Sequence, residues 1–433
     1  MFSDRTFSDR AFSDRAFSDR AFSDRTNWKL TRNRLTEALV EVQASGARVL
    51  DLTLSNPTRA GLHYDEREIL QALASPQVLD YDAQPKGLRS AREAVSDYYR
   101  SSHGIAEFDA ERLILTTSTS EGYSFVFRLL CNPGDELLVP KPSYPLFEFL
   151  ADLQDVKLVP YPLLYDHGWQ MDFPSLEKAV GDRTRGVVVV HPNNPTGSYV
   201  HAHERELLNQ FCREHGLAII ADEVFLDYGL DVSWQDTSAH NISLHDVSTK
   251  APRDSPRKSF AANQDVLTFT LSGVSKISAL PQMKVAWIAT SGPAAEVEAA
   301  QARLEVIADT FLSMNAPIQW ATAAFLAQRA SIQGQLLKRV RANLAELDRQ
   351  LAGQKICERM VVEAGWYVVL RVPVTQTDEE LAVDLLREKS VLVHPGHFYD
   401  FPSDGYLVLS LIVAPEEFAE GIRRVLEFLI VDC

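Results

Sequence analysis

The sequence predicts an α/β fold in which a mostly parallel, seven-stranded sheet is flanked by helices and accompanied by a smaller α/β domain. Three observations predict it. Short apolar segments alternate along the chain with longer segments of helical periodicity. Several apolar segments are apolar at consecutive positions, as strands buried on both faces are. The last part of the chain repeats this alternation on a smaller scale.

The predicted strands of the large sheet all lie between residues 112 and 290. They are RLILTT (112–117), ELLVP (136–140), KLVPYPL (157–163), GVVVVH (186–191), LAIIADE (217–223), VLTFTL (266–271) and KVAWIAT (284–290). Helical patterns separate them, for example at 87–103 and 203–216. This strand-helix-strand order favours a sheet covered by helices on both faces.

Long helical patterns follow after residue 292, at 317–330 and 335–351. A shorter α/β tail comes next, and we expect it to pack with the residues that precede the large domain. Its predicted elements are GWYVVLRVP (365–373), a helix near 377–388, VLVHPG (391–396), GYLVLSLIV (405–413) and a helix from Pro415. The predicted division is a large domain at 61–325 and a small domain formed by 27–60 and 326–433.

Two polar segments are predicted to lie outside this core. Residues 2–26 are five tandem copies of FSDR, each followed by Thr or Ala, with one Asp and one Arg per copy and no helical or strand stripe. We expect residues 1–26 to be a disordered arm produced by tandem duplication, with a partner-binding tail as the alternative. The polar stretch 232–264 predicts an exposed excursion from the sheet.

The net charge and the cysteine positions limit the partners and the compartment that we expect for this protein. The net charge of −16 argues against a nucleic-acid or anionic-membrane partner, because both would repel such a surface. No apolar run approaches the roughly 18 residues needed to span a bilayer. The four cysteines (Cys131, Cys212, Cys357 and Cys433) are far apart and form no CxxC pair, which fits a reducing compartment. We therefore expect a cytoplasmic protein.

Several polar residues follow predicted strands directly. Ligands of open α/β sheets gather at the carboxyl ends of the strands. Ser118–Ser120 follow the first strand and open a helical pattern, Asn194 lies in HPNNPTG (191–197), and Asp222 ends the fifth strand. Each signal is weak alone, since NPTG also forms turns and a terminal Asp often caps a helix. Their common edge predicts a ligand site.

Lys276 follows the sixth strand, between small hydroxyl residues in SGVSKISALPQMKVAW (272–287). It is either a solvated loop lysine or an amine that loses its proton and attacks a carbonyl. From about Asn27 onward the chain resembles the class I/II aminotransferases of the fold-type-I pyridoxal-phosphate superfamily, and the resemblance favours the nucleophile. The motifs that carry it are YDAQPKG (81–87), GDELLVPKPSYP (134–145), HPNNPTG, ADEVF (221–225), SK (275–276) and PEEFAEGIRR (415–424).

The resemblance implies a pyridoxal 5'-phosphate-dependent aminotransferase that moves an amino group from an amino donor to a 2-oxo acid or related carbonyl acceptor by a ping-pong Schiff-base mechanism. Lys276 would form the Schiff base with the cofactor and later move the substrate proton. Asp222 would keep the pyridine nitrogen protonated, and Tyr144 would stack on the ring. These three residues are the predicted catalytic set.

The same resemblance implies the remaining cofactor contacts. Asn194 would bind the ring hydroxyl oxygen, and the phosphate would sit at the helix start at 118–120, where free N–H groups converge. Tyr81 resembles a tyrosine that reaches the phosphate from the neighbouring subunit, which implies a homodimer with shared sites. The predicted cofactor-binding residues are Ser118, Thr119, Ser120, Tyr144, Asn194, Asp222, Phe225, Ser272, Ser275, Lys276, Lys284 and Tyr81.

One departure from the family pattern removes a hydrogen-bond donor. The family usually has a tyrosine three residues after the aspartate, where this chain has Phe225. Losing a donor to a charged acceptor removes roughly 1.5–3 kcal/mol, so we expect the Schiff-base pKa to be raised by about one to two units. Tyr228 lies nearby in the sequence and is a candidate substitute donor.

Two further departures surround Lys276. Gln282 and Lys284 stand where the family has a glycine and a phosphate-binding arginine, and Lys284 supplies charge without a bidentate fork. Gly273 replaces the usual serine three residues before the lysine, with Ser272 and Ser275 beside it. We expect an altered phosphate site that is still polar and cationic.

The last departure concerns the substrate. Matching GYLVLSLIV to the family motif puts Val408 in place of the arginine that binds the substrate's α-carboxylate. Arg371, His394, His397 or a group of the partner subunit would then take over, or the donor would lack a free α-carboxylate. Each of the three side chains also has a surface or structural role as its ordinary interpretation.

Other reactions and functions remain open at this point. The same scaffold could perform β-elimination or decarboxylation, and a non-catalytic cofactor-binding regulatory protein is a different-class alternative. The pairing of Lys276 with Asp222 favours catalysis. His201 and His203 could suggest a metal, but two near-adjacent histidines at a helix start are usually solvated, and we expect no metal site.

Overall fold

The computed structural model describes residues 22–28, 30–230 and 258–431. Its large sheet contains all seven predicted strands and an eighth, β5, at one edge. The strands are β2 (Leu113–Thr116), β3 (Glu136–Lys141), β4 (Lys157–Tyr165), β5 (Trp169–Met171), β6 (Thr184–Val190), β7 (Ala218–Asp222), β8 (Thr268–Gly273) and β9 (Ala286–Ser291). Their order across the sheet is β2-β9-β8-β7-β6-β3-β4-β5.

The centre of the sheet is parallel, as predicted. Strands β4, β3, β6, β7 and β8 run in the same direction. Strand β9 is antiparallel to both β2 and β8, and β5 is antiparallel to β4. The seventh strand was predicted to begin two residues too early, because Lys284 has a left-handed backbone (φ 55°) and β9 begins only at Ala286.

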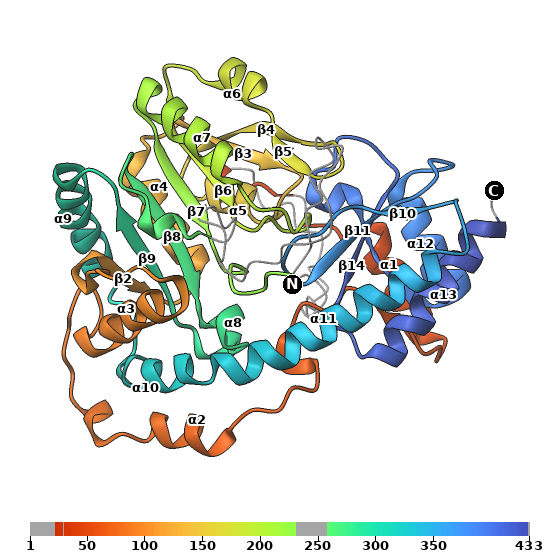
Figure 1. Ribbon diagram of the computed structural model, residues 1–433, viewed down its shortest axis with the longest axis horizontal. Helices are drawn as coiled ribbons and strands as arrows, with labels where there is room; N and C mark the ends of the chain where they lie inside the picture. The colour runs from red at the N-terminus through yellow and green to blue at the C-terminus, as the bar shows by residue number, and fades with distance from the viewer. Residues whose placement is uncertain (1–21, 29, 231–257, 432–433) are drawn as a thin grey trace, which may run out of the picture.

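Both faces of the sheet are buried, which explains the apolar runs (Figure 1). In β6, Val188 and Val190 pack toward α4, α5 and α9, whereas Val187 and Val189 pack toward α7. Helices α3 and α10 cover the region of β2 and β9 on that second face. The helices of this part are α2 (Glu66–Leu73), α3 (Arg89–His103), α4 (Thr119–Leu130), α5 (Phe147–Asp152), α6 (Phe173–Ala179), α7 (Ala202–His215), α8 (Val274–Ile277), α9 (Ala294–Phe311) and α10 (Ala316–Ala327).

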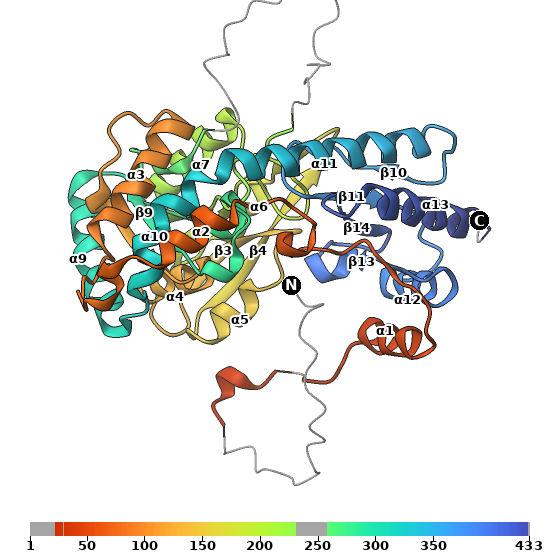
Figure 2. The ribbon, with the colours of Figure 1, turned by 90° about the horizontal axis from the view of Figure 1, so that it is seen from below.

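A smaller sheet lies beside the large one, with its strands in the order β10-β11-β14-β13 (Figure 2). Strand β1, near the N-terminus, pairs in parallel with β12, and α1 packs on α12. The elements of this part are β1 (Leu50–Asp51), β10 (Glu358–Arg359), β11 (Tyr367–Arg371), β12 (Val391–Leu392), β13 (His394–Pro395), β14 (Tyr406–Ser410), α1 (Arg34–Ala44), α12 (Asp378–Lys389) and α13 (Pro415–Val431). Helix α11 (Arg329–Leu351) runs from α10 to α13 and connects the two parts (Figure 1).

The two polar segments differ in part from expectation. Residues 258–264 are described and are not an exposed excursion, since Phe260 is fully buried and its amide donates to Glu223. The last FSDR copy is also ordered where it is described: Asp24–Thr26 form a 3₁₀ turn, and Arg25 pairs with Asp155. The other parts of both segments lie outside the described residues.

Among the described residues, no helix has both the length and the apolar character needed to cross a membrane.

Candidate active site

The register of the large sheet brings the predicted site residues to one edge. Asp222 at the end of β7 pairs with Val190 at the end of β6 and with Leu271 on β8. Strand β8 leads directly into α8, which carries Lys276. On the other side of β8, Gly273 pairs with Ala286, and Ala286 pairs with Thr116, from which the chain enters α4.

Asp222 is a buried carboxylate whose recorded hydrogen-bond donors within the described chain are neutral. The Tyr123 hydroxyl of α4 donates to Oδ2 at 3.0 Å, and the Val224 amide donates to Oδ1 at 3.1 Å. Burial raises the pKa of Asp222 to about 6, although these two hydrogen bonds and the charge of Lys276 act in the opposite direction. A carboxylate in this position is ionised most readily when a cationic partner is bound against it.

Lys276 is surrounded by protein but keeps part of its surface accessible. Its Nζ lies 4.8 Å from the centroid of the Trp366 ring and 5.4 Å from that of Phe225. Burial lowers the pKa of Lys276 to about 8, with the charge of Asp222 opposing the shift. Much more of this amine is therefore neutral near pH 7 than of a solvated lysine, whose pKa is about 10.4.

Phe225 lies at the site, but the suggested substitute donor does not replace the missing tyrosine. The Phe225 ring is buried and packs edge-on against Trp366 at 5.2 Å. The Tyr228 hydroxyl donates its proton to the backbone carbonyl of Lys276 at 2.6 Å. Tyr228 is fully buried there, so its hydroxyl holds the backbone of the lysine rather than a ligand.

Asn194 and Tyr144 come from two neighbouring loops at the same edge. The Oδ1 atom of Asn194 is buried without a hydrogen-bond partner among the described residues. The side-chain amide of Asn193 donates to the carbonyl of Pro142, which joins the HPNNPTG loop to the loop that carries Tyr144. Burial raises the pKa of the Tyr144 phenol, and the charges of Tyr367 and Asp222 raise it further. Tyr144 and Asp222 are thus close enough to interact electrostatically.

The predicted phosphate region has a helix N-terminus and several hydroxyl groups. Ser118 caps α4 by accepting a hydrogen bond from the Glu121 amide, and Thr119 and Ser120 form its first turn, partly exposed. The Ser272 hydroxyl is buried and points to the Glu223 carbonyl at 3.5 Å, whereas Ser275 is partly exposed. Gly273 has a physical reason: a Cβ there would lie 2.7 Å from the Val285 carbonyl oxygen, so no serine fits.

Two predicted residues lie apart from the buried group. Lys284 is exposed, and no ion pair is recorded for it within the part of the chain that is described. Tyr81 is 82% exposed and lines a separate surface cavity. Neither residue is brought into contact with Lys276 or Asp222 within one chain.

The position at which the family carries an arginine, Val408 in this chain, lies in the small sheet. Val408 on β14 is 1% exposed and pairs with Val369 on β11 and with His394 on β13. Arg371 is exposed and forms an ion pair with Glu358, and His397 is exposed. Of the three substitutes considered, His394 is the one beside Val408.

Sequence reasoning missed two residues of this site, Tyr123 and Trp366. Tyr123 lies four residues after Thr119, one helical turn along the same face of α4, and this spacing could have indicated it. Trp366 precedes β11 in a distant part of the chain, and only the packing of the small sheet against the large one places it beside Lys276. No local pattern points to it.

The residues present fit pyridoxal phosphate. The lysine with a lowered pKa, the buried carboxylate and the unpartnered Asn194 oxygen lie at one sheet edge, with an aromatic side chain and a helix N-terminus beside them. A ligand with an aldehyde, a protonatable ring nitrogen and a phosphate matches each of these groups.

The two histidines considered as metal ligands, His201 and His203, have different surroundings. His201 forms an ion pair with Glu363 at 3.2 Å at the start of α7, and His203 is exposed. Across the described residues, no group of three or more His, Cys, Asp or Glu side chains is arranged to hold a metal ion.

Comparisons with known proteins identify the family of the chain. The family model described as aminotransferase class I and II matches residues 48–424. An alanine aminotransferase of Mycobacterium bovis is 30% identical over 414 residues, covering 92% of this chain and 90% of that protein. The glutamate-pyruvate aminotransferase AlaA of Escherichia coli is 26% identical over 383 residues, covering 86% of this chain and 88% of the relative. Among solved structures, an alanine aminotransferase from Pyrococcus furiosus superposes with a TM-score of 0.81 at 20% identity, covering 95% of this chain and all of that one (100%), which shows the same fold.

Proposed function

The chain belongs to the class I and II aminotransferase family and is a pyridoxal-phosphate-dependent aminotransferase, and from this premise we propose that Lys276, Asp222 and Tyr144 carry its chemistry. The enzyme takes an amino donor and a carbonyl acceptor. The observation that carries our assignment is the electrostatic interaction of the buried Lys276 and Asp222 side chains. Burial brings the pKa of the lysine down to about 8 and that of the aspartate up to about 6.

Pyridoxal phosphate supplies an aldehyde for the donor amine and a ring that withdraws electrons from the carbon losing its proton. Lys276 would hold the cofactor through its amine and, in its neutral form, would serve as the base that moves the substrate proton. Asp222, when ionised, would keep a proton on the ring nitrogen. Tyr144 would pack against the ring, and Tyr123 orients Asp222 through the hydrogen bond to Oδ2.

The rest of the predicted set has supporting roles in this proposal. Ser118–Ser120 and the free N–H groups of α4 bind the phosphate, together with Ser272, Ser275 and Lys284. Asn194 binds the ring hydroxyl. The exposed position of Lys284 supports a peripheral charge rather than a bidentate contact.

The direct test of the function is a change of absorbance. Purified protein loaded with pyridoxal phosphate should absorb near the violet edge of the visible range and lose this band when a competent donor is added. Alanine is the first donor to screen, because the relatives of M. bovis and P. furiosus are alanine aminotransferases. Adding a 2-oxo acid should restore the band. A donor that bleaches the band irreversibly, or releases carbon dioxide or a β-leaving group, would instead support a lyase or a decarboxylase.

Replacing Phe225 with tyrosine should lower the pKa of the Lys276–cofactor linkage by about one to two units, because a phenol would then donate to the charged ring oxygen. An absorbance titration of both proteins measures this pKa. Tyr228→Phe is the matched control. The Tyr228 hydroxyl is bound to the Lys276 carbonyl, so its removal should leave the pKa of the linkage unchanged. An unchanged pKa in Phe225→Tyr would show that the ring oxygen already has a donor.

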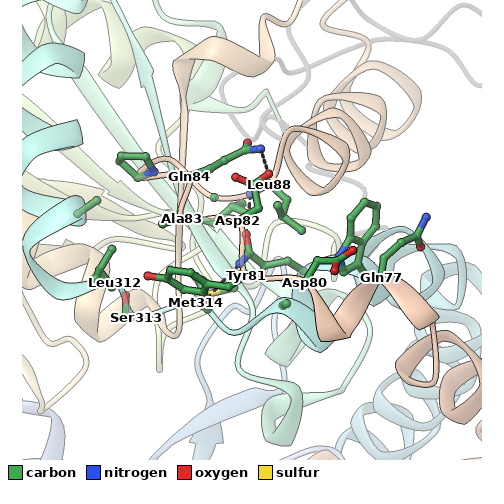
Figure 3. Close-up of a pocket in the computed structure, with 17 residues that line it drawn as sticks. Gln77, Asp80, Tyr81, Asp82, Ala83, Gln84, Leu88, Leu312, Ser313 and Met314 are labelled. Atoms are coloured by element: carbon green, nitrogen blue, oxygen red, sulfur yellow. Dashed lines mark hydrogen bonds between the residues drawn. The ribbon is translucent and has the colours of Figure 1, made fainter.

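We also propose that the enzyme is a homodimer whose subunits share their sites. Tyr81, Leu79 and Leu312 are 82%, 88% and 56% exposed. Tyr81 and Leu312 line a cavity of about 230 Å³, in which Tyr81 lies across from Leu312 and Met314 (Figure 3). Exposed apolar side chains gathered around a hollow are typical of a surface that another protein covers. A symmetric dimer that buries them would bring Tyr81 to the partner's phosphate site.

Mixing two inactive variants tests the shared site. Tyr81→Ala and Lys276→Ala should each be poorly active alone. After joint unfolding and refolding, half of the dimers are mixed, and each mixed dimer has one complete site. The mixture should therefore recover about a quarter of the wild-type activity. If Tyr81 acts within its own chain, no complete site forms and no activity returns.

We propose a two-domain division of the chain and a location in a reducing compartment. Separate apolar cores in the two parts support a large domain at 61–325 and a small one from 27–60 and 326–433. The described thiols, which are all free, support a reducing compartment such as the cytoplasm.

A further inference from the structure

The small sheet presents an apolar residue where an α-carboxylate would need a cation. Strand β14 lies between β11 and β13 (Figure 2). Val408 is in the middle of β14, and its side chain is 1% exposed. A valine neither carries charge nor donates a hydrogen bond. The group attached to the donor's amine-bearing carbon must therefore bind to another side chain.

His394 is placed to do this, and Arg371 is not. Arg371 pairs with Tyr406 at the far end of β14, and its exposed guanidinium is bound to Glu358. His394 pairs with Val408 itself, and its ring is partly exposed. Its Nδ1 atom lies 3.0 Å from the Tyr399 hydroxyl.

This hydrogen bond couples the tautomer of His394 to the orientation of the Tyr399 hydroxyl, since either group can donate. Burial raises the pKa of Tyr399, so its hydroxyl is protonated. Burial also lowers the pKa of His394 to about 3, so the imidazole is neutral near pH 7. In the tautomer in which the phenol donates its proton to Nδ1, the imidazole proton resides on Nε2. Within the described chain no hydrogen-bond partner is recorded for Nε2, so this tautomer presents one N–H donor, and it is the tautomer on which our proposal rests.

Tyr399 connects this donor to the catalytic group. The Ser143 amide donates to the Tyr399 carbonyl at 2.9 Å, next to Tyr144. The pKa of Tyr399 is raised by burial first and then by the charges of Tyr367 and Tyr144. Tyr144 in turn interacts with Asp222. His394 is thus hydrogen-bonded to Tyr399, which in turn interacts electrostatically with Tyr144.

We propose that Nε2 of His394 binds an oxygen of the group on the donor's amine-bearing carbon, and that the enzyme accepts donors with an uncharged carboxamide there at least as well as free amino acids. The inference rests on the proposed function, because the donor amine must reach a cofactor held by Lys276.

A neutral hydrogen-bond donor on the protein changes the relative affinity for substrates with a carboxamide and substrates with a carboxylate. An arginine favours a carboxylate through charge and two parallel hydrogen bonds. A neutral N–H group makes one hydrogen bond to either oxygen and leaves the negative charge of a carboxylate uncompensated. Because removing an unpaired carboxylate from water is costly, the uncharged group is at least as favourable here.

The first measurement compares kcat/KM for L-alaninamide and L-alanine in the full-length, cofactor-loaded enzyme. We expect the amide-to-acid ratio to be one or higher. His394→Leu should lower kcat/KM for the amide by about tenfold, because one hydrogen bond is lost. His394→Gln keeps an N–H donor and should retain most of the wild-type kcat/KM for the amide. His397→Leu changes a nearby exposed residue and is the control. It should leave kcat/KM unchanged for both the amide and the acid.

The second measurement separates binding from turnover. 2-Methylalaninamide and 2-methylalanine have no hydrogen on the amine-bearing carbon, so they bind without reacting further. Titrating the absorbance of the bound cofactor gives their Kd values, which should follow the same order and show the same loss in His394→Leu. If His394→Leu fails to fold, the order of the two Kd values in the wild-type enzyme decides.

Tighter binding of the free acid than of the amide, or a folded His394→Leu protein that behaves like His397→Leu, would overturn this inference and leave the proposed function intact. A wild-type protein without cofactor on Lys276 would overturn both.

Discussion

Replacing Lys276 with alanine should reduce transamination by at least about 10⁴-fold, because the variant loses both the covalent attachment of the cofactor and the base that moves the proton. The remaining contacts are those of Asp222, Tyr144 and the α4 N-terminus, so cofactor should still bind, but reversibly. Measuring kcat with the donor identified by the absorbance screen, and cofactor retention after dialysis, checks both expectations.

Two additional measurements make this result specific to the amine. Lys178→Ala removes an exposed lysine of α6 and should leave kcat unchanged. Small primary amines added to Lys276→Ala should restore part of the activity, because they can enter the space left by the side chain and accept the proton. Full activity in Lys276→Ala would contradict the assignment of the base.

Replacing Asp222 with asparagine should have the second largest effect, a loss of about 10²- to 10⁴-fold in kcat. Asparagine cannot hold a proton on the ring nitrogen, and a loss of this size corresponds to about 3–5 kcal/mol in the activation free energy. Asp309→Asn, on the exposed face of α9, is the matched control and should be as active as the wild type.

Although Asp222→Asn should lose activity, its cofactor-free form should gain stability against unfolding. In the cofactor-free protein, burial raises the pKa of Asp222 from 3.8 to about 6. The folded state then binds more protons than the unfolded state between these values, so wild-type stability falls as pH rises from about 4 to 6 and the penalty persists above 6. Cofactor-free Asp222→Asn lacks this penalty and should be more stable at pH 7, by up to about 3 kcal/mol.

Urea unfolding of the cofactor-free proteins at pH 4 and pH 7 measures this difference. We expect a gain for Asp222→Asn at pH 7 and little or none at pH 4. A variant that is both inactive and less stable at pH 7 would indicate a structural role for Asp222. A gain in stability with a loss of activity indicates a residue retained for chemistry.

Much of this fold followed from patterns within single segments. The consecutive apolar residues of β6 predicted a strand buried on both faces, and Val187 and Val188 do pack on opposite faces. The meeting of Asp222 and Lys276 was also predictable, because adjacent strands of an α/β sheet end at the same edge. Here β7 and β8 are adjacent and parallel.

What the sequence did not predict depends on contacts between distant segments. Trp366 reaches Lys276 only because the small sheet packs on the large one. Phe260 lies in a polar stretch, yet it is buried because Glu223 accepts the Ser259 hydroxyl and the Phe260 amide. Tyr228 is close to Phe225 in the chain, but its hydroxyl is bound to the Lys276 carbonyl. Short-range spacing contains no information on such partners.

One measurement tests the central assignment most directly. The cofactor-loaded enzyme is treated with borohydride, which makes the link between a lysine and pyridoxal phosphate permanent, and is then digested and mapped by mass spectrometry. We predict a single modified peptide, with the cofactor on Lys276, and none in Lys276→Ala. Cofactor found on Lys284 or on another lysine, or on no lysine at all, would contradict the account.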